Sequence, residues 1–215
     1  MPSLKVSKEN LLKSLIYEYR NGKPIYYKNY KKVLEGAISK EEVMGSSSLH
    51  ALLVMLIGAY LKSVLGKRFL VLGGELGYIP KRGTRYNLDL AVFEREKLQK
   101  EGIRDSYVKT PPKVVIEIDP KIEPEKFGSE DNYILAKTQD LLDSGVETVI
   151  WFLTRERKVL FAQRGKDWLI SNWERDLKIT EEVTLNIEKL LKEEGITLDT
   201  YKVASKNPTP KGRGF

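Results

Sequence analysis

Four acidic residues and one lysine lie at or near the ends of successive apolar segments, and they are Glu75, Asp89, Glu117, Asp119 and Lys137. Two or three carboxylates that converge at strand ends can hold Mg²⁺, which binds a few carboxylate oxygens together with water. A metal ion in such a site polarises a phosphate and lowers the pKa of an attacking water. A lysine beside it can orient that water or stabilise the developing negative charge. The pattern therefore indicates metal-dependent chemistry on a phosphate ester.

Each of these residues also has a purely structural explanation. An aspartate in a strand can be an edge residue, the dipeptide Asp119-Pro120 is a turn signal, and a helical lysine usually faces solvent. The combination favours a site because the acids lie in a row, in a chain without cysteine and with one histidine. That composition argues against the usual zinc sites and against cysteine nucleophiles. The single histidine, His50, could act as a general base, but it is expected instead to pack or cap at the start of a helix.

The elements that must position these residues follow from apolar periodicity and turn signals. Asn21-Gly22 between two Tyr- and Ile-rich arms predicts a hairpin over residues 15–27. Helices are predicted over 48–65, 129–144 and 186–194, and strands over 69–72, 76–79, 88–93, 113–118, 147–153, 158–163 and 168–170. This order predicts an α/β fold with a mixed central sheet, helix 48–65 on one face and helix 129–144 on the other.

The length of 215 residues indicates one domain over residues 1–201, with an N-terminal helix and hairpin in 1–45 and the core in 46–201. Residues 202–215 are expected to form a disordered basic tail. No secretory signal is evident. The most apolar run, Ala51–Leu61, is about half the length that spans a bilayer. We therefore expect a soluble cytoplasmic protein that does not contact a membrane.

The net charge of +7 is unevenly distributed. Residues 1–113 carry 21 basic and 11 acidic side chains, whereas residues 114–201 carry 12 basic and 19 acidic ones. A basic region of this kind favours a polyanionic partner through counterion release. A lysine-rich solubilising surface explains the same charge equally well.

The motif order resembles that of the Uma-type restriction endonuclease family, within the PD-(D/E)XK nuclease superfamily, over about residues 15–194. The resemblance rests on the segments YEYRNGKPIY, His50 at the start of a helix, YNLDLAVF, VVIEID, AKTQDLLDSGV and ETVIWFL. It departs from the superfamily pattern at Leu88, where proline is expected before Asp89. It also departs at Asp119, which stands where the ExK pattern has its lysine.

This resemblance implies a restriction-endonuclease-like core and a Mg²⁺- or Mn²⁺-dependent endonuclease that hydrolyses phosphodiester bonds in DNA. Asp89 and Glu117 match the family's metal ligands, and Lys137 matches its catalytic lysine, displaced onto the following helix. The backbone carbonyl of Ile118 is expected to complete the metal shell. Two further acids, Asp119 and Glu75, are candidate ligands.

Two other classes of function stay open on the sequence. The chain could be a non-catalytic DNA- or protein-binding module on a nuclease-like scaffold, and metal binding would discriminate the two. It could also be a structural dimer that is indifferent to DNA. A homodimer is expected if both DNA strands are cut, because each subunit would cut one strand.

Overall fold

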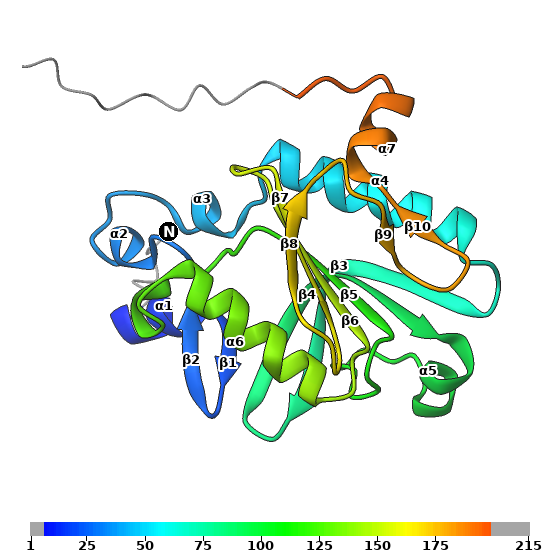
Figure 1. The fold of residues 1–215 in the computed structure, drawn as a ribbon. Helices are drawn as coiled ribbons and strands as arrows, with labels where there is room; N and C mark the ends of the chain where they lie inside the picture. The colour runs from blue at the N-terminus through cyan, green and yellow to red at the C-terminus, as the bar shows by residue number, and fades with distance from the viewer. Residues whose placement is uncertain (1–6, 199–215) are drawn as a thin grey trace, which may run out of the picture.

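A computed structural model describes residues 7–198, and it contains an eight-stranded mixed sheet flanked by helices (Figure 1). The strands run in the order β2-β1-β4-β5-β6-β7-β8, and β3 also pairs with β4. Their bounds are β1 Ile16–Arg20, β2 Lys23–Tyr26, β3 Phe69–Lys81, β4 Thr84–Glu94, β5 Val114–Ile118, β6 Thr148–Leu153, β7 Lys158–Gln163 and β8 Leu169–Asn172. The sheet is mixed because β5 and β6 are parallel while the other neighbours are antiparallel.

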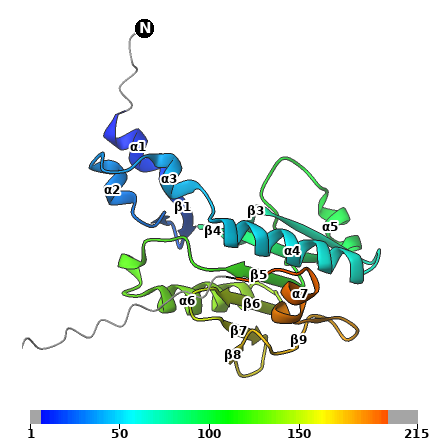
Figure 2. The ribbon, with the colours of Figure 1, turned by 90° about the horizontal axis from the view of Figure 1, so that it is seen from above.

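The helices are distributed over both faces of this sheet and over the N-terminal region. Their bounds are α1 Lys8–Ser14, α2 Tyr30–Leu34, α3 Lys40–Met44, α4 Ser48–Val64, α5 Arg95–Glu101, α6 Glu130–Asp143 and α7 Ile187–Glu193, with a 3₁₀ turn η1 at Pro124–Lys126. Three small elements, α1, α2 and α3, lie together beside the β1–β2 hairpin (Figures 1 and 2).

Two hydrophobic clusters lie on opposite faces of the sheet, one beneath α4 and one beneath α6. Leu53, Ile57 and Leu61 of α4 join Leu90 and Ile116 of the sheet in one cluster. The other cluster combines residues of α6 with residues on the facing side of the sheet, among them Tyr133, Leu141, Leu88, Val115 and Trp151. Figure 2 shows the two helices on either side of the strands, so the predicted layers and fold class are confirmed.

The buried carboxylate of Asp140 links helix α6 to the sheet by hydrogen bonds. Asp140 Oδ2 accepts a hydrogen bond from Arg20 Nε at 2.6 Å and another from the Tyr86 hydroxyl at 2.6 Å. Its Oδ1 accepts from Lys81 Nζ at 3.0 Å. Arg20 lies on β1, Lys81 on β3 and Tyr86 on β4. Asp140 therefore sets the position of the helix relative to three strands at once.

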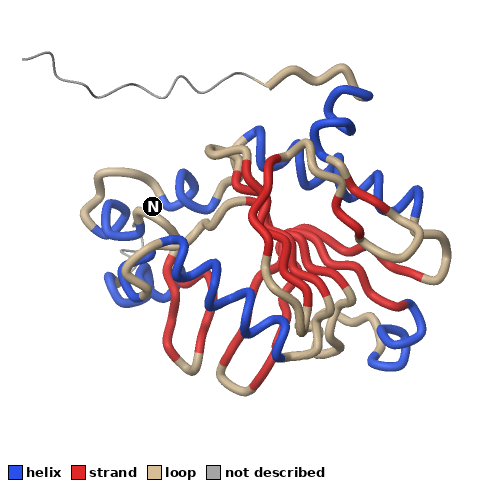
Figure 3. Tube along the Cα trace, in the orientation of Figure 1, coloured by secondary structure: helices blue, strands red, loops and turns tan. Residues whose placement is uncertain are grey.

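The sequence predicts most elements within a few residues, and the differences concern the strands around Asp89. Predicted strands 69–72 and 76–79 are parts of one long strand, β3, whose register against β4 shifts between Gly73 and Leu76 (Figure 3). At this bulge Glu75 has φ 57°. Strand β4 starts at Thr84, four residues before the predicted 88–93, because its first half pairs with β1 and β3 and needs no continuous apolar pattern.

Two elements escape the sequence pattern altogether. A two-stranded sheet forms from β9 (Leu177–Lys178) and β10 (Thr184–Leu185), which are too short to show a period.

The segment 40–64 is long and apolar enough, by length and composition, to cross a membrane. In the structure its longer helix, α4, packs Leu53, Ile57 and Leu61 into the core. The predicted tail, 202–215, lies outside the described residues.

Candidate active site at the fork between β4 and β5

The site lies where β4 separates from β5. The two strands pair only from Leu90 to Val92, and at its other end β4 pairs with β1 through Arg85. Beyond that short ladder, the amide of Ile118 donates to Asp89 Oδ2 at 2.8 Å. The carboxylate of Asp89 thus accepts the hydrogen bond of the Ile118 amide, which has no backbone partner on β4 because the two strands have separated there. This bond fixes Asp89 against the end of β5.

Asp89 is buried, with 3% of its surface exposed, and three groups hold it. Besides the Ile118 amide, His50 Nε2 lies 3.1 Å from its Oδ1 and Lys121 Nζ lies 3.8 Å from the same oxygen. Burial raises the pKa of this carboxyl, but the contacts with His50, Lys121 and the amide outweigh burial and lower the pKa overall. Asp89 therefore stays ionised in the fold.

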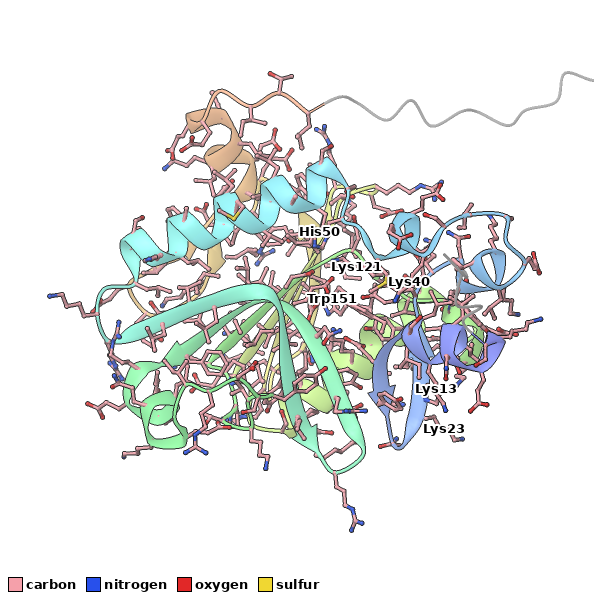
Figure 4. The ribbon with its side chains drawn as sticks, turned by 180° about the vertical axis from the view of Figure 1, so that it is seen from behind. Lys13, Lys23, Lys40, His50, Lys121 and Trp151 are labelled. Atoms are coloured by element: carbon pink, nitrogen blue, oxygen red, sulfur yellow. The ribbon has the colours of Figure 1, made fainter. Side chains whose placement is uncertain are left out.

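His50 is positioned by the start of α4. Its amide donates to the Ser47 hydroxyl, which caps the helix. The expectation that His50 packs at a helix start is therefore met, and the structure adds a contact that the sequence did not reveal. The ring is buried and reaches Asp89 on the neighbouring strand. Figure 4 shows His50 and Lys121 together near the beginning of α4.

A second group of charges surrounds Lys137, on the α6 side of the sheet. Its Nζ donates to Glu18 Oε1 at 2.8 Å and to the backbone carbonyl of Asn87 at 2.8 Å. It also forms an ion pair with Glu117, whose Oε1 lies 3.1 Å away. Three acceptors thus surround one ammonium group, and Lys137 is only 1% exposed. The contact with Glu117 joins two of the residues that the sequence singles out.

Glu18, which the sequence analysis did not single out, completes this group. It lies on β1, where a register shift between Ile16 and Glu18 turns it inward. Its Oε1 also accepts from the Asn87 amide at 2.9 Å, and its Oε2 accepts from the Tyr133 hydroxyl at 2.6 Å. An acid inside the Tyr-rich arm of the hairpin is the one sequence signal that could have pointed to it.

Burial and neighbouring charge act in opposite directions on Glu117 and Lys137. Burial, opposed by the charge of Lys137 and assisted by the negative charges of Asp89 and Glu18, raises the pKa of Glu117 to about 8. Burial alone would lower the pKa of Lys137, but the attraction of Glu117 and Glu18 raises it. Lys137 is therefore a permanent cation and a hydrogen-bond donor, not a base.

Aromatic rings enclose the ammonium group of Lys137. Its Nζ lies 5.3 Å from the ring centre of Tyr86, 5.9 Å from that of Tyr133 and 5.6 Å from that of Trp151. Rings at this distance attract a cation through their quadrupoles. They also exclude water, which strengthens the ion contacts between them. Trp151, a buried core residue, is thus also one wall of the charged cluster.

Glu75 lies at the outer side of the site and connects to Asp89 through a lysine. Its Oε1 is 2.7 Å from Lys121 Nζ, which also contacts Asp89. The phenol of Tyr17 is buried near these acids. Its pKa is raised well above the usual value, chiefly by burial and then by the negative charges of Glu18, Asp89, Glu117 and Glu75.

Asp119 and the Ile118 backbone have other partners. Asp119 has φ 47°, and both of its carboxylate oxygens accept hydrogen bonds from Thr154, one from the amide at 2.8 Å and one from the hydroxyl. This arrangement closes a turn between β5 and the end of β6. Ile118 contacts Asp89 through its amide. A role for its carbonyl, or for Asp119, in metal binding stays a prediction.

A cavity of about 160 Å³ lies beside Glu18 and Asn87, two of the residues that contact Lys137. Tyr17 also lines it, and Lys13 and Arg85 bring positive charge to it. Lys13 is on α1 and Arg85 on β4, so the N-terminal region contributes to the lining of this cavity; Figure 4 shows Lys13 on that N-terminal part of the chain. These cations would favour an anionic ligand beside the buried acids.

The donor set suits a hard divalent cation, although within residues 7–198 no three acidic or histidine side chains are grouped closely enough to hold one. Glu117 Oε1 is buried and contacts the Lys137 ammonium group at 3.1 Å without a regular hydrogen bond, so this carboxylate oxygen keeps a lone pair for a cation. Asp89 supplies a second carboxylate on the adjacent strand. Carboxylate oxygens are the ligands that Mg²⁺ and Mn²⁺ prefer.

Comparison with known proteins identifies the fold. No protein-family model and no curated protein matches this sequence. The structure matches that of a protein described as a "putative nuclease belonging to DUF820" from Anabaena variabilis, with a TM-score of 0.56. The match covers 87% of this chain and 98% of that one, at 16% sequence identity. The predicted nuclease-like fold is thus confirmed over most of the chain.

Proposed function

We propose that this protein is a Mg²⁺- or Mn²⁺-dependent endonuclease that hydrolyses phosphodiester bonds in DNA. The observation that carries the proposal is the fork between β4 and β5, which brings Asp89, Glu117 and Lys137 from three elements into one charged region. The fold, which is similar to that of a protein described as a "putative nuclease", supports the same proposal. A fold supports many activities, so the residues at the fork carry the argument.

Asp89 and Glu117 would bind the metal ion through their carboxylates, with the Ile118 carbonyl as a third ligand. The bound ion supplies Lewis-acid polarisation of the phosphate and a more acidic water. The Ile118 amide and His50 hold Asp89 in orientation. Metal binding requires the ionised form of Glu117, and burial raises the pKa of this carboxyl, so binding is favoured as the pH rises.

Lys137 would orient the attacking water and stabilise the negative charge that develops on the phosphate. It does so as a cation, because its two carboxylate neighbours keep it protonated. Glu18 and the Asn87 carbonyl hold its Nζ in place. Glu18 is therefore a positioning residue for Lys137 in this proposal.

The test uses isosteric substitutions, because alanine at buried charges would disturb the fold. Asp89→Asn and Glu117→Gln remove a metal ligand with little change in shape. We expect the wild type to nick supercoiled plasmid DNA with Mg²⁺ or Mn²⁺ and not with EDTA. Both variants should lose this cleavage at least a hundredfold while a cooperative thermal melt shows that each remains folded at the assay temperature. The matched control is Glu125→Gln, which changes an exposed acid paired with Lys31.

One observation favours the alternative of a non-catalytic binding module on the same scaffold. Lys137 is almost fully buried and its ammonium group is surrounded by three protein acceptors. Calorimetric titration with Mn²⁺ separates the two functions. Binding that Glu117→Gln abolishes supports the nuclease, whereas no binding at millimolar Mn²⁺ supports the module. Unchanged cleavage by the Asp89 and Glu117 variants would exclude the assignment of these residues.

A further inference from the structure

Lys121 places a positive charge directly at the outer carboxylates of the site. Its Nζ lies 2.7 Å from Glu75 Oε1 and 3.8 Å from Asp89 Oδ1. It also donates to the Ser46 hydroxyl at 3.1 Å. These three partners come from β3, β4 and the segment before α4, and Lys121 itself follows β5. One ammonium group therefore joins four parts of the chain at the site.

The two lysines of the site differ in their freedom to move. The side chain of Lys137 is 1% exposed and enclosed by aromatic rings, whereas that of Lys121 is 14% exposed. Lys121 lies outside the regular elements, in the connection between β5 and η1. Its partner Glu75 is 36% exposed, at the bulge of β3. Lys121 can therefore leave Asp89 for Glu75 and solvent without disturbing the core.

The oxygens of Asp89 are already occupied in this structure. Its Oδ2 accepts from the Ile118 amide, and its Oδ1 faces His50 and Lys121. A divalent cation at Asp89 would lie within a few ångströms of the Lys121 ammonium group. Like charges at that separation repel strongly in a partly buried site. Asp89 cannot hold both cations in these positions.

We propose that Lys121 is a tethered counter-ion of the site, which neutralises Asp89 and Glu75 in the metal-free protein and competes with the divalent ion for them. Metal binding then displaces the ammonium group from Asp89. The affinity for metal is set partly by this competition. The inference rests on the proposed function, since it assumes that Asp89 is a metal ligand.

The experiment measures Mn²⁺ binding to the full-length protein by calorimetry, with no DNA present. Lys121→Met and Lys121→Gln remove the tethered charge, and Lys121→Arg retains it. The matched control is Lys28→Met, which removes an equal charge from a surface pair with Glu130. A thermal melt in EDTA establishes that each variant is folded, and the two neutral substitutions guard against failure of either one.

We expect Lys121→Met and Lys121→Gln to bind Mn²⁺ about tenfold more tightly than the wild type. Lys121→Arg and Lys28→Met should bind as the wild type does. Binding by the neutral variants alone, with none by the wild type, would also support the inference. Equal or weaker binding by folded neutral variants overturns it while leaving the metal site intact. Absence of Mn²⁺ binding in every protein overturns both the inference and the metal-dependent function.

Discussion

Lys137 on α6 donates to Glu18 on β1 at 2.8 Å, and both side chains are buried although 119 positions separate them in the chain. Glu117 on β5 lies on another side of the same ammonium group. The charges therefore stabilise one another across three elements. A buried pair of this kind is costly to break, because the remaining partner keeps its charge in a low-dielectric interior.

We expect Glu18→Gln and Lys137→Met each to lower the free energy of unfolding by about 3 kcal/mol, the range for removal of one partner of a buried ion pair. The double variant should lose less than the sum of the two, because it leaves no unpaired charge from this contact. Urea denaturation measures all four corners of this double-mutant cycle. Strictly additive losses would show that Glu18 and Lys137 are not coupled.

The pH dependence of stability should reveal the link at Asp140. Burial raises the pKa of this carboxyl, but Arg20, Tyr86 and Lys81 outweigh burial and hold its pKa below 3.8. A lowered pKa contributes stability that is complete above the unfolded value and is lost as the pH falls through the folded value. Asp140→Asn should therefore be less stable than the wild type by about 2 kcal/mol at neutral pH.

That difference between Asp140→Asn and the wild type should shrink as the pH falls below about 4, because Asp140 takes up a proton first in the unfolded chain and at lower pH in the folded protein. Guanidinium denaturation at several pH values measures it. As a control, Glu156→Gln changes an exposed acid and should leave the profile unaltered. A difference that stays constant down to pH 2 would contradict the assignment to Asp140.

Asp119 is expected to stabilise a turn rather than the metal site. Asp119→Asn retains a residue type that tolerates φ 47°, but it replaces one of the two acceptors for Thr154. We expect a loss of about 1 kcal/mol in stability. Mn²⁺ affinity, measured by calorimetry, should change less than twofold. A tenfold loss of affinity in the folded variant would instead place Asp119 among the ligands.

DNA binding should depend on the cations that line the cavity next to Glu18. The double variant Lys13→Gln/Arg85→Gln removes two positive charges from the lining of this cavity. We expect weaker binding, and a plot of log affinity against log salt whose slope falls by about 2. Fluorescence anisotropy with a DNA duplex measures both effects. Lys192→Gln, an exposed lysine on α7, is the control and should leave the slope unchanged.

Several features were predictable because their causes are local. The Asn21-Gly22 turn, the serine caps at Ser7, Ser47 and Ser129, and the apolar period of α4 each depend on a few neighbouring residues. The position of Asp89 in an apolar strand and of Glu117 at a strand end was readable in the same way. Strand lengths around the bulge were not, because they depend on partners far away in the chain.

The sequence by itself determined the residue types and the order of elements: acids at strand ends, a lysine on the helix between two parallel strands, and a chain with little other catalytic chemistry. Only the tertiary structure decided which of these residues meet. Glu18, His50 and Lys121 join the site because β1 pairs with β4, α4 crosses one face of the sheet and the chain after β5 folds back toward Glu75. Such contacts arise from long-range packing, in which the distance along the chain carries no information about proximity. Asp119 shows that proximity in the sequence does not ensure a shared site. It is only two residues from Glu117, but its backbone conformation directs its carboxylate to Thr154.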